Sequence, residues 1–396
     1  MVNFGLFAVI ASLIGSTLAK PVLRRGQYSP KYVDPRNVTL PLPAKTIAQL
    51  NRSDTFFENI VARSNGDLLV TLYEPVGSIY IIQEPYSDSR RFSELYNFNP
   101  GMDPNGGPGV EYTAILGIGE VELSHDRDEV FVVCGGRFHR GNDPVHDAIN
   151  GTMGVWEVRF PASYSSRRGY PTSGGSHQQP SQLPKVEVKR IASIPDAGLL
   201  NGITHIPGTG AVAVTDNNNG RIYHLDMASG RSRILVDTPQ TRPKPVASSG
   251  FAVNGIKASA DGRYLYWSNS DLISVYRIRL GSDGLSARGA AVELVADLHG
   301  LAIAVDDFAL DDAGNVWVTT DVDNMLVRVA RNGSTQVVVG APIELTVAGD
   351  TAVAFGRTKW DRSTIYVSTN GATVAPVNGT IIEPAKVVAV DARGLL

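Results

Sequence analysis

The stretch Asp306-Asp307-Phe308-Ala309, followed after a turn by Val316-Trp317-Val318-Thr319, decides the fold because its pattern recurs along the chain. In each copy an acidic or amide residue precedes a small or polar residue and apolar positions, and an apolar strand follows. The other clear copies begin at Glu58, Asn201 and Asn254. A repeat with a period of tens of residues indicates that one structural unit is used several times.

Two weaker copies begin at Gly119 and Thr351, which gives six units. From Asn201 onwards the units are spaced like four-stranded propeller blades, which take roughly 40 to 50 residues each. We therefore predict an all-β fold, a six-bladed β-propeller with four-stranded blades. Open sheet edges invite aggregation, so a strand at 44–50 is expected to pair with 386–390 in the last blade and close the ring. A β-helix or a pair of β-sandwiches fits the unit length and regularity less well.

The ends of the chain and its composition predict a secreted protein. Residues 1–19 have the apolar run and small residues of a signal peptide, residues 20–43 form a polar, proline-rich arm, and residues 44–396 form the propeller. The apolar run is too short to span a membrane, which takes roughly 20 residues. We expect secretion or residence in the secretory lumen, with no membrane contact after cleavage. Five sequons are candidate glycosylation sites: Asn37, Asn51, Asn150, Asn332 and Asn378.

The charge and cysteine content exclude several classes. A net charge of −3 shows no basic excess, so no nucleic-acid partner is expected, and we predict a monomer that acts on a small molecule. Cys134 is the only cysteine, so no intrachain disulfide can form. It lies in an apolar strand and is predicted to pack in the core. The chain has no nucleophile elbow, P-loop or His-Glu-x-x-His motif.

The repeats resemble those of the six-bladed propeller superfamily of gluconolactonases and senescence marker protein, often called regucalcin-like. The segments that carry the resemblance are 58–71, 305–318, 351–358 and 376–391. Within the superfamily the chain is most similar to a fungal secreted branch. The resemblance covers nearly all of the chain after the signal and is specific for fold and branch, but weakly specific for reaction.

Lactonases of this superfamily hold one divalent ion at the axis with a Glu, two Asn and an Asp. The resemblance places these ligands at Glu58, Asn201, Asn254 and Asp306, a hard oxygen set that suits Ca²⁺, Mg²⁺ or Mn²⁺, with Zn²⁺ as a further candidate. Asp306 would then be a ligand or general base. This chain departs from the family pattern at Asp307, where the family has a glycine, and the departure adds a carboxylate beside the axis. Alternatively, Asn201 and Asn254 simply cap turns, because each precedes a glycine.

The fungal branch includes hetero-Diels–Alderases of tropolone–sesquiterpene biosynthesis, which join a quinone-methide-type diene to a terpene alkene such as humulene. This resemblance makes cycloaddition the favoured function, with a metal-dependent lactone hydrolase and a non-enzymatic ligand-binding propeller as alternatives. A strictosidine-synthase-like reaction stays open as well, because that enzyme shares the fold. A cycloaddition requires no cofactor, only apolar walls that hold the reactants and a hydrogen-bond donor. Candidate catalytic residues are Glu58, Asp306 and Arg137, with His139 and Arg140 as further donors; candidate substrate-binding residues are Tyr73, Phe251 and Phe308. A solvated loop is the competing interpretation for Arg137, His139 and Arg140, and core packing is the competing interpretation for Tyr73 and Phe308.

Overall fold

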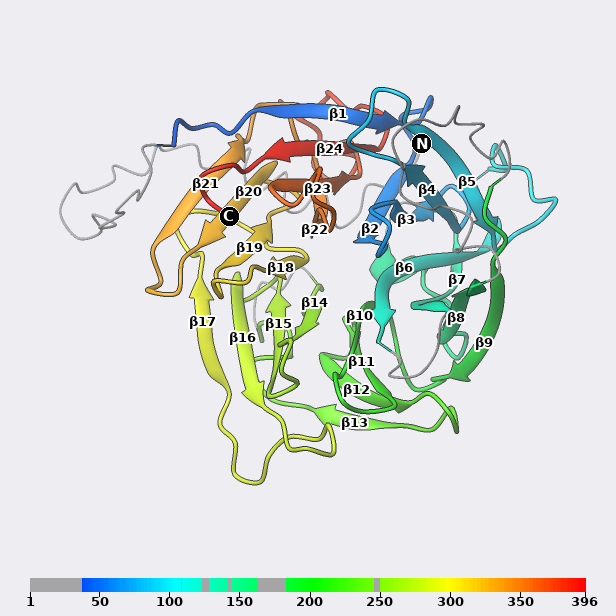
Figure 1. Ribbon diagram of the computed structural model, residues 1–396. Coiled ribbons are helices and arrows are strands. Elements are labelled where there is room, and N and C mark those ends of the chain that lie inside the picture. The colour runs from blue at the N-terminus through cyan, green and yellow to red at the C-terminus, as the bar shows by residue number, and fades with distance from the viewer. Residues whose placement is uncertain (1–37, 108, 123–127, 142–143, 163–182, 246–249) are drawn as a thin grey trace.

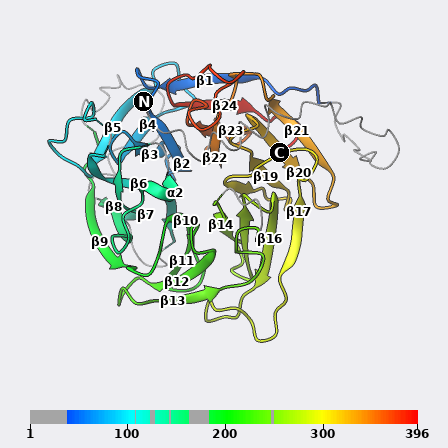
Figure 2. The same cartoon turned by 180° about the vertical axis from the view of Figure 1, so that it is seen from behind.

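The computed structural model describes residues 38–107, 109–122, 128–141, 144–162, 183–245 and 250–396. Six four-stranded antiparallel sheets stand in a ring around a central axis, as Figures 1 and 2 show from opposite sides. The predicted six-bladed β-propeller is thus confirmed. The predicted signal peptide, residues 20–37 of the predicted arm and the sequon at Asn37 lie outside the described residues. Among the described residues, no helix has the length and apolarity needed to cross a membrane.

Blades 1 to 5 run outward from an inner strand in chain order, and blade 6 does so for its first three strands. Blade 1 contains β2 (Phe56–Ala62), β3 (Leu68–Glu74), β4 (Ser78–Gln83) and β5 (Arg91–Asn97). Blade 2 contains β6 (Glu111–Val121), β7 (Glu129–His139), β8 (Gly154–Phe160) and β9 (Glu187–Ser193), with the short helix α2 (Pro144–Asp147) after β7. Blade 3 contains β10 (Leu200–His205), β11 (Ala211–Asp216), β12 (Arg221–Asp226) and β13 (Ser232–Val236).

The second half of the ring repeats the arrangement. Blade 4 contains β14 (Val253–Ala258), β15 (Tyr264–Asn269), β16 (Ser274–Arg279) and β17 (Glu293–Asp297). Blade 5 contains β18 (Phe308–Leu310), β19 (Val316–Thr319), β20 (Met325–Val329) and β21 (Thr335–Gly340). Blade 6 contains β22 (Asp350–Phe355), β23 (Thr364–Thr369), β24 (Lys386–Asp391) and, outermost, β1 (Ala44–Gln49).

The ring closes as predicted, because a strand from the N-terminal part of the chain pairs with the last blade. β1 pairs antiparallel with β24, so Ala44 lies opposite Val390 and Gln49 opposite Lys386. The described residues just before β1 are anchored as well, since the Leu42 amide donates to the Val338 carbonyl of blade 5 at 2.7 Å and its side chain is buried. Both ends of the chain therefore contribute to blade 6, and its outer edge is formed by a segment that comes before blade 1 (Figure 1).

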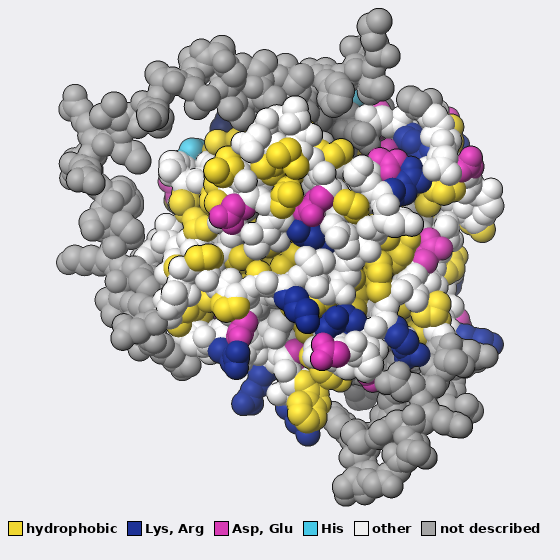
Figure 3. All heavy atoms as spheres, turned by 90° about the horizontal axis from the view of Figure 1, so that it is seen from above, with side chains coloured by type: hydrophobic (Ala, Val, Ile, Leu, Met, Phe, Trp, Pro, Cys, Tyr) yellow, Lys and Arg dark blue, Asp and Glu magenta, His cyan; other side chains and the backbone are white. Residues whose placement is uncertain are grey.

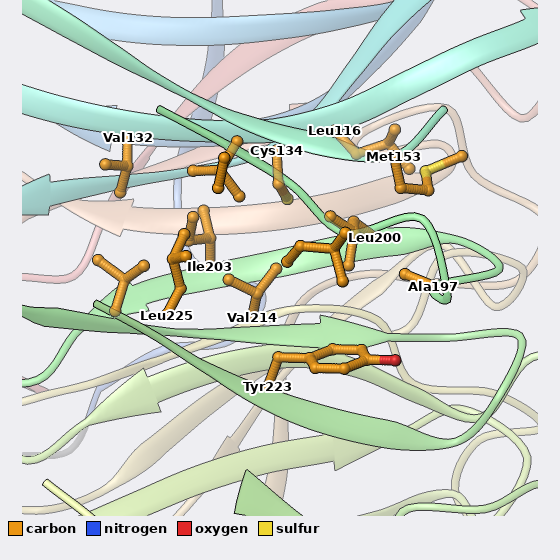
Figure 4. Close-up of a cluster of buried hydrophobic side chains, with 14 of the residues drawn as sticks. Leu116, Val132, Cys134, Met153, Ala197, Leu200, Ile203, Val214, Tyr223 and Leu225 are labelled. Carbon is orange, nitrogen blue, oxygen red and sulfur yellow. The ribbon is translucent and has the colours of Figure 1, made fainter. Parts of the chain in front are cut away.

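Apolar side chains fill the six interfaces between neighbouring blades. Each of six hydrophobic clusters joins two adjacent sheets, and Figure 4 shows the one between blades 2 and 3. Successive side chains of a strand point to opposite faces of its sheet. In β3, for example, Leu69 packs toward blade 2 while Leu68 and Val70 pack toward blade 6. Both faces of the inner strands are buried, which is why these strands read as nearly continuous apolar runs.

Candidate functional site

All six inner strands begin at the same end of the propeller, which we call the axial mouth, and four predicted site residues lie there. Glu58, Asn201, Asn254 and Asp306 are all buried. In β2, β10 and β14 the pairing register is interrupted at the predicted residue, which releases it from the regular ladder. Four separate repeats therefore bring oxygen-bearing side chains to equivalent places.

The predicted residues of different blades meet across the axis. Asn201 Nδ2 donates a hydrogen bond to Glu58 Oε1 at 3.1 Å, although blade 2 lies between their blades. Asn254 Nδ2 donates to Ser270 Oγ at 3.0 Å, and its buried Oδ1 accepts no hydrogen bond from the described residues. Asp306 interacts with Glu58 through charge, since repulsion from Glu58 helps to raise the pKa of Asp306.

Burial favours the protonated form of these carboxyl groups. It raises the pKa of Glu58 to about 8, and repulsion from Asp321 adds to the shift while the hydrogen bond from Asn201 opposes it. Burial and the nearby carboxylates, Glu58 first, raise the pKa of Asp306 well above its usual range. Without a bound cation, burial and mutual repulsion therefore shift Glu58 and Asp306 toward the protonated form, which can donate a hydrogen bond.

Sequence reasoning missed Asp321, a third carboxyl group of this cluster. Burial raises its pKa to about 7, although the hydrogen bond from Asn370 Nδ2, 2.7 Å long, opposes the shift. Its backbone is left-handed, with φ of 51°, just after β19. The sequence signal was a carboxylate directly after the second strand of a blade, where the chain returns to the axial mouth.

Asp307, the additional carboxylate, has its own cation. Lys257 Nζ lies 2.6 and 2.8 Å from the two carboxylate oxygens, and Asn59 Nδ2 of blade 1 donates to Asp307 Oδ2 at 3.0 Å. This group joins blades 1, 4 and 5 across the axis. Gly255 makes room for it, because a Cβ at that residue would lie 2.2 Å from Asp307 Oδ1. Asp307 thus acts as a cross-link below the predicted residues.

A hydrogen bond from the second strand of one blade to the inner strand of the next recurs around the axis. Three threonines make it with their hydroxyl groups, and a cysteine thiol makes it in blade 2. The donors and the residues whose carbonyls accept are Thr71 to Leu116, Cys134 to Asn201, Thr215 to Asn254 and Thr319 to Thr351. Cys134 is fully buried, as predicted, and burial raises its thiol pKa.

The same pattern corrects one prediction. Leu116, not Gly119, occupies the position in blade 2 that Asn201 occupies in blade 3. The reason is that β6 already begins at Glu111, and its register is interrupted between Ile115 and Ile118. Blade 2 therefore contributes an apolar side chain where blades 1, 3, 4 and 5 contribute oxygen atoms.

The predicted substrate-binding residues are not brought together. Phe308 is fully buried in the core between blades 4 and 5, and Phe251 is half-buried just before β14. Tyr73 is buried at the mouth end of β3, where its ring contacts three others at centroid distances of 5.3 to 6.3 Å: Phe56, Tyr112 and Phe138. The core interpretation therefore holds for Phe308 and also for Tyr73, which is 2% exposed and belongs to a hydrophobic core cluster near the rim of the axial mouth.

The predicted donors lie on the same rim, but away from the axial carboxyl groups. Arg137 is more than half exposed and pairs with Glu111. Arg140 donates from Nη2 to the Pro75 carbonyl at 2.8 Å, and its guanidinium lies 5.9 Å from the centroid of the Tyr112 ring. His139 is exposed. These contacts make Arg140 a rim-packing residue and leave Glu58 and Asp306 as the predicted catalytic residues that lie at the axis.

The axial residues also fit a divalent cation in their chemistry. Two carboxylates and two amides form an all-oxygen set, and the Asn254 Oδ1 is a buried acceptor without a donor. Among the described residues, no three His, Cys, Asp or Glu side chains are grouped to hold a metal ion. A cation would therefore depend on the amide oxygens of Asn201 and Asn254 as well as on the two carboxylates.

Comparison with known proteins supports the sequence-based resemblance. Residues 234–371 match the SMP-30/gluconolactonase/LRE-like region. A protein from a Phoma species, provisionally assigned as a hetero-Diels-Alderase, is 28% identical over 365 residues, which cover 86% of this chain and 90% of that protein. The asR5 protein of Sarocladium schorii, with the same provisional assignment, is 25% identical over 382 residues, or 89% and 84% of the two chains. The predicted resemblance is thereby confirmed.

Solved structures show the same fold at low identity. A luciferin-regenerating enzyme aligns with a TM-score of 0.55 and 15% identity, covering 88% of this chain and 95% of its own. A calcium-binding regucalcin from Agrobacterium tumefaciens aligns with a TM-score of 0.51 and 14% identity, covering 89% and 96%. At these identities the likeness concerns the propeller fold and carries no information about the reaction.

Proposed function

We propose that this protein is a cyclase that forms a ring by hetero-Diels–Alder cycloaddition. The observation that carries the proposal is its similarity, along most of both chains, to two proteins provisionally assigned to that reaction. The proposed reactants are a quinone-methide-type diene and a terpene alkene such as humulene, as in fungal tropolone–sesquiterpenoid metabolism. The proposed location is outside the cell or in the secretory lumen.

In the proposed mechanism the protein holds two reactants in register and polarises one of them. One C–C and one C–O bond form while the π bonds of the diene and alkene rearrange, and no proton has to leave. Alignment alone can lower the barrier by roughly 7 to 11 kcal/mol. A protonated Glu58 or Asp306 donates a hydrogen bond to the carbonyl oxygen of the diene and withdraws electron density from it. The raised pKa of Glu58 supports this role.

The second candidate is a metal-dependent lactone hydrolase, which the unpartnered Oδ1 of Asn254 favours. Glu58, Asn201, Asn254 and Asp306 would hold the cation. When bound, a divalent cation supplies Lewis acidity toward a lactone carbonyl and lowers the pKa of water. Asp306 would act as ligand or base. A ligand-binding propeller without catalysis is the third candidate and would convert neither class of substrate.

Isosteric substitutions separate these candidates. Glu58→Gln and Asp306→Asn keep a hydrogen-bond donor but remove the negative charge that a cation needs. Under the cyclase proposal, the cycloaddition rate should stay within about tenfold of wild type in Glu58→Gln, and fall about a hundredfold in Glu58→Ala, which has no donor. The assay is product formation from a generated quinone methide and humulene, with and without chelator. A loss as large in Glu58→Gln as in Glu58→Ala would contradict the donor role.

The same variants test the hydrolase. Lactone hydrolysis should fall more than about a hundredfold in both Glu58→Gln and Asp306→Asn, and should stop on chelation. Unfolding in urea verifies that each variant is folded. Saturable turnover of simple lactones by the wild type, lost in both variants, would establish the hydrolase instead of the cyclase.

The predicted secretion and glycosylation remain proposals with direct tests. Asn51, Asn150, Asn332 and Asn378 are exposed, so a glycosyltransferase could reach them. Expression in a eukaryotic host should give protein in the culture medium, and its mass should fall on treatment with an N-glycosidase. Retention inside the cell, with no mass change, would contradict this part of the proposal. Size exclusion of the treated protein tests the proposed monomer.

A further inference from the structure

A second candidate binding site lies at the end of the propeller opposite the axial mouth. It is a groove of about 540 Å³, formed where β1 begins, β24 ends and residues 357–363 turn from β22 into β23. β22 starts at the mouth, so its turn into β23 lies at the far end. On the side of the molecule that carries β1, Lys and Arg side chains lie close to exposed hydrophobic ones (Figure 3). The groove is therefore separate from Glu58 and Asp306.

The groove is positively charged on a protein whose net charge is −3. Its charged lining residues are Lys45, Lys359, Arg362, Arg393 and Asp391. Asp391, the only acidic one, is already bound by Arg393. No carboxylate within the described part of the chain forms an ion pair with Lys359 or Arg362. Two cations thus remain available to an anionic ligand.

An exposed tryptophan stands beside these cations. Trp360 is 63% exposed, and Lys359 Nζ lies 4.6 Å from the centroid of its ring. The turn is held by the buried Asp361, whose Oδ1 accepts from the Thr358 amide at 2.8 Å and whose Oδ2 accepts from the Tyr366 hydroxyl at 3.0 Å. A large ring presented to solvent by a fixed turn is preorganised for binding.

We propose that this groove binds an anionic sugar, a pyranose that bears a carboxylate or phosphate group. Arg362 and Lys359 bind the anion, and the apolar face of the sugar ring packs on Trp360. The volume falls within the range of roughly 300 to 1,000 Å³ typical of small-ligand sites. A single-stranded nucleic acid fits less well, because its successive bases stack on a series of aromatic rings and Trp360 is the only aromatic residue of the lining. This inference is independent of the reaction at the axial mouth.

Calorimetric titration of the full chain tests the proposal with digalacturonate and glucose 6-phosphate, which separate carboxylate from phosphate. Inorganic phosphate, neutral maltose and a short oligothymidylate are the comparison probes. Saturable binding of at least one anionic sugar is expected, weakened about tenfold or more by Trp360→Ala and by Arg362→Glu. Arg233→Glu, an exposed change on β13, should have no effect. Tryptophan fluorescence gives a second readout, because Trp360 is exposed whereas Trp267 and Trp317 are fully buried.

Three results would overturn the proposal. The first is no saturable binding of either anionic sugar. The second is binding of inorganic phosphate, maltose or oligothymidylate as tight as that of the sugars. The third is unchanged affinity in both groove variants. All the substituted side chains are exposed, so urea midpoints close to wild type are expected and verify that any lost affinity is local.

Discussion

Replacing Lys257 with Met tests the cross-link below the axial site. The Asp307 side chain is 3% exposed, and Lys257 is the cation that compensates its negative charge. Asn59 Nδ2 and the Phe308 amide also donate hydrogen bonds to its carboxylate, at 3.0 and 2.8 Å. Met has nearly the same length as Lys but no charge. The substitution therefore leaves a buried carboxylate with two hydrogen bonds and no cation.

The expected loss of unfolding free energy is about 2 to 3 kcal/mol. Removing one partner of a fully buried ion pair costs about 3 to 5 kcal/mol. The loss expected here is smaller than that range, because the Lys257 side chain is 26% exposed and the two remaining hydrogen bonds stabilise the charge of Asp307. Urea unfolding at pH 7 measures the loss through the fluorescence of Trp267 and Trp317, which are buried in the flanking blades 4 and 5.

A second substitution separates charge from packing. In Lys257→Met combined with Asp307→Asn, the uncompensated charge is gone, so the stability should return to within about 1 kcal/mol of wild type. Arg263→Met removes the exposed partner of Asp261 as a matched control and should change stability by less than about 0.5 kcal/mol. The reasoning is refuted if Lys257→Met matches wild type, or if the double variant is as unstable as the single one.

Four further substitutions, at three residues, test the axial geometry by urea unfolding. For Glu58, the folded-state pKa of about 8 exceeds the ordinary 4.5, so in chelator this residue should lower wild-type stability between these pH values by about 1.4 kcal/mol per pH unit, in addition to the falls caused by Asp306 and Asp321. Glu58→Gln should lose the Glu58 contribution and show a shallower fall, and profiles parallel to wild type would contradict the shift. Gly255→Ala should cost more than about 2 kcal/mol, since its Cβ would meet Asp307; a neutral effect would place Asp307 elsewhere. Cys134→Ser should stay within about 1 kcal/mol of wild type, because hydroxyl groups fill this place in other blades, whereas Cys134→Val leaves the Asn201 carbonyl unpaired and should cost about 1 to 3 kcal/mol more. Equal losses would contradict the donor role.

The ring of blades could be predicted from sequence because its signal is local and repeated. Every blade must bury both faces of its inner strands, so each unit carries an apolar run, which follows an acidic or amide residue in blades 1, 3, 4 and 5. The positions of Glu58, Asn201, Asn254 and Asp306 followed from that repeat. The pairing of β1 with the last blade could be predicted from a general constraint, since a ring of sheets with an open edge would be prone to aggregation.

What the sequence did not predict depends on contacts between blades. The cross-link of Lys257, Asp307 and Asn59 joins residues from three blades, and no local pattern relates them. Asp321 joins the carboxyl cluster because its own backbone is left-handed after β19, a conformation that has no counterpart in the repeat. The lead position of blade 2 was predicted at the wrong residue, because β6 is extended and its bulge lies at Leu116. Such features follow from packing around an axis and not from periodicity along one strand.

The charge balance at the axis links the two catalytic candidates. Lys257 already compensates Asp307, and Asn201 and Asn370 offer hydrogen bonds but no charge to Glu58 and Asp321. Glu58, Asp306 and Asp321 therefore cannot all be ionised in this buried place unless a cation joins them. Protons satisfy the balance in one way and leave neutral donors, as the cyclase needs. A divalent ion satisfies it in the other way and leaves ionised ligands, as the hydrolase needs. The two functions require opposite charge states of the same residues, so metal content of the purified protein, measured at pH 7 beside Glu58→Gln, separates them before any substrate is known.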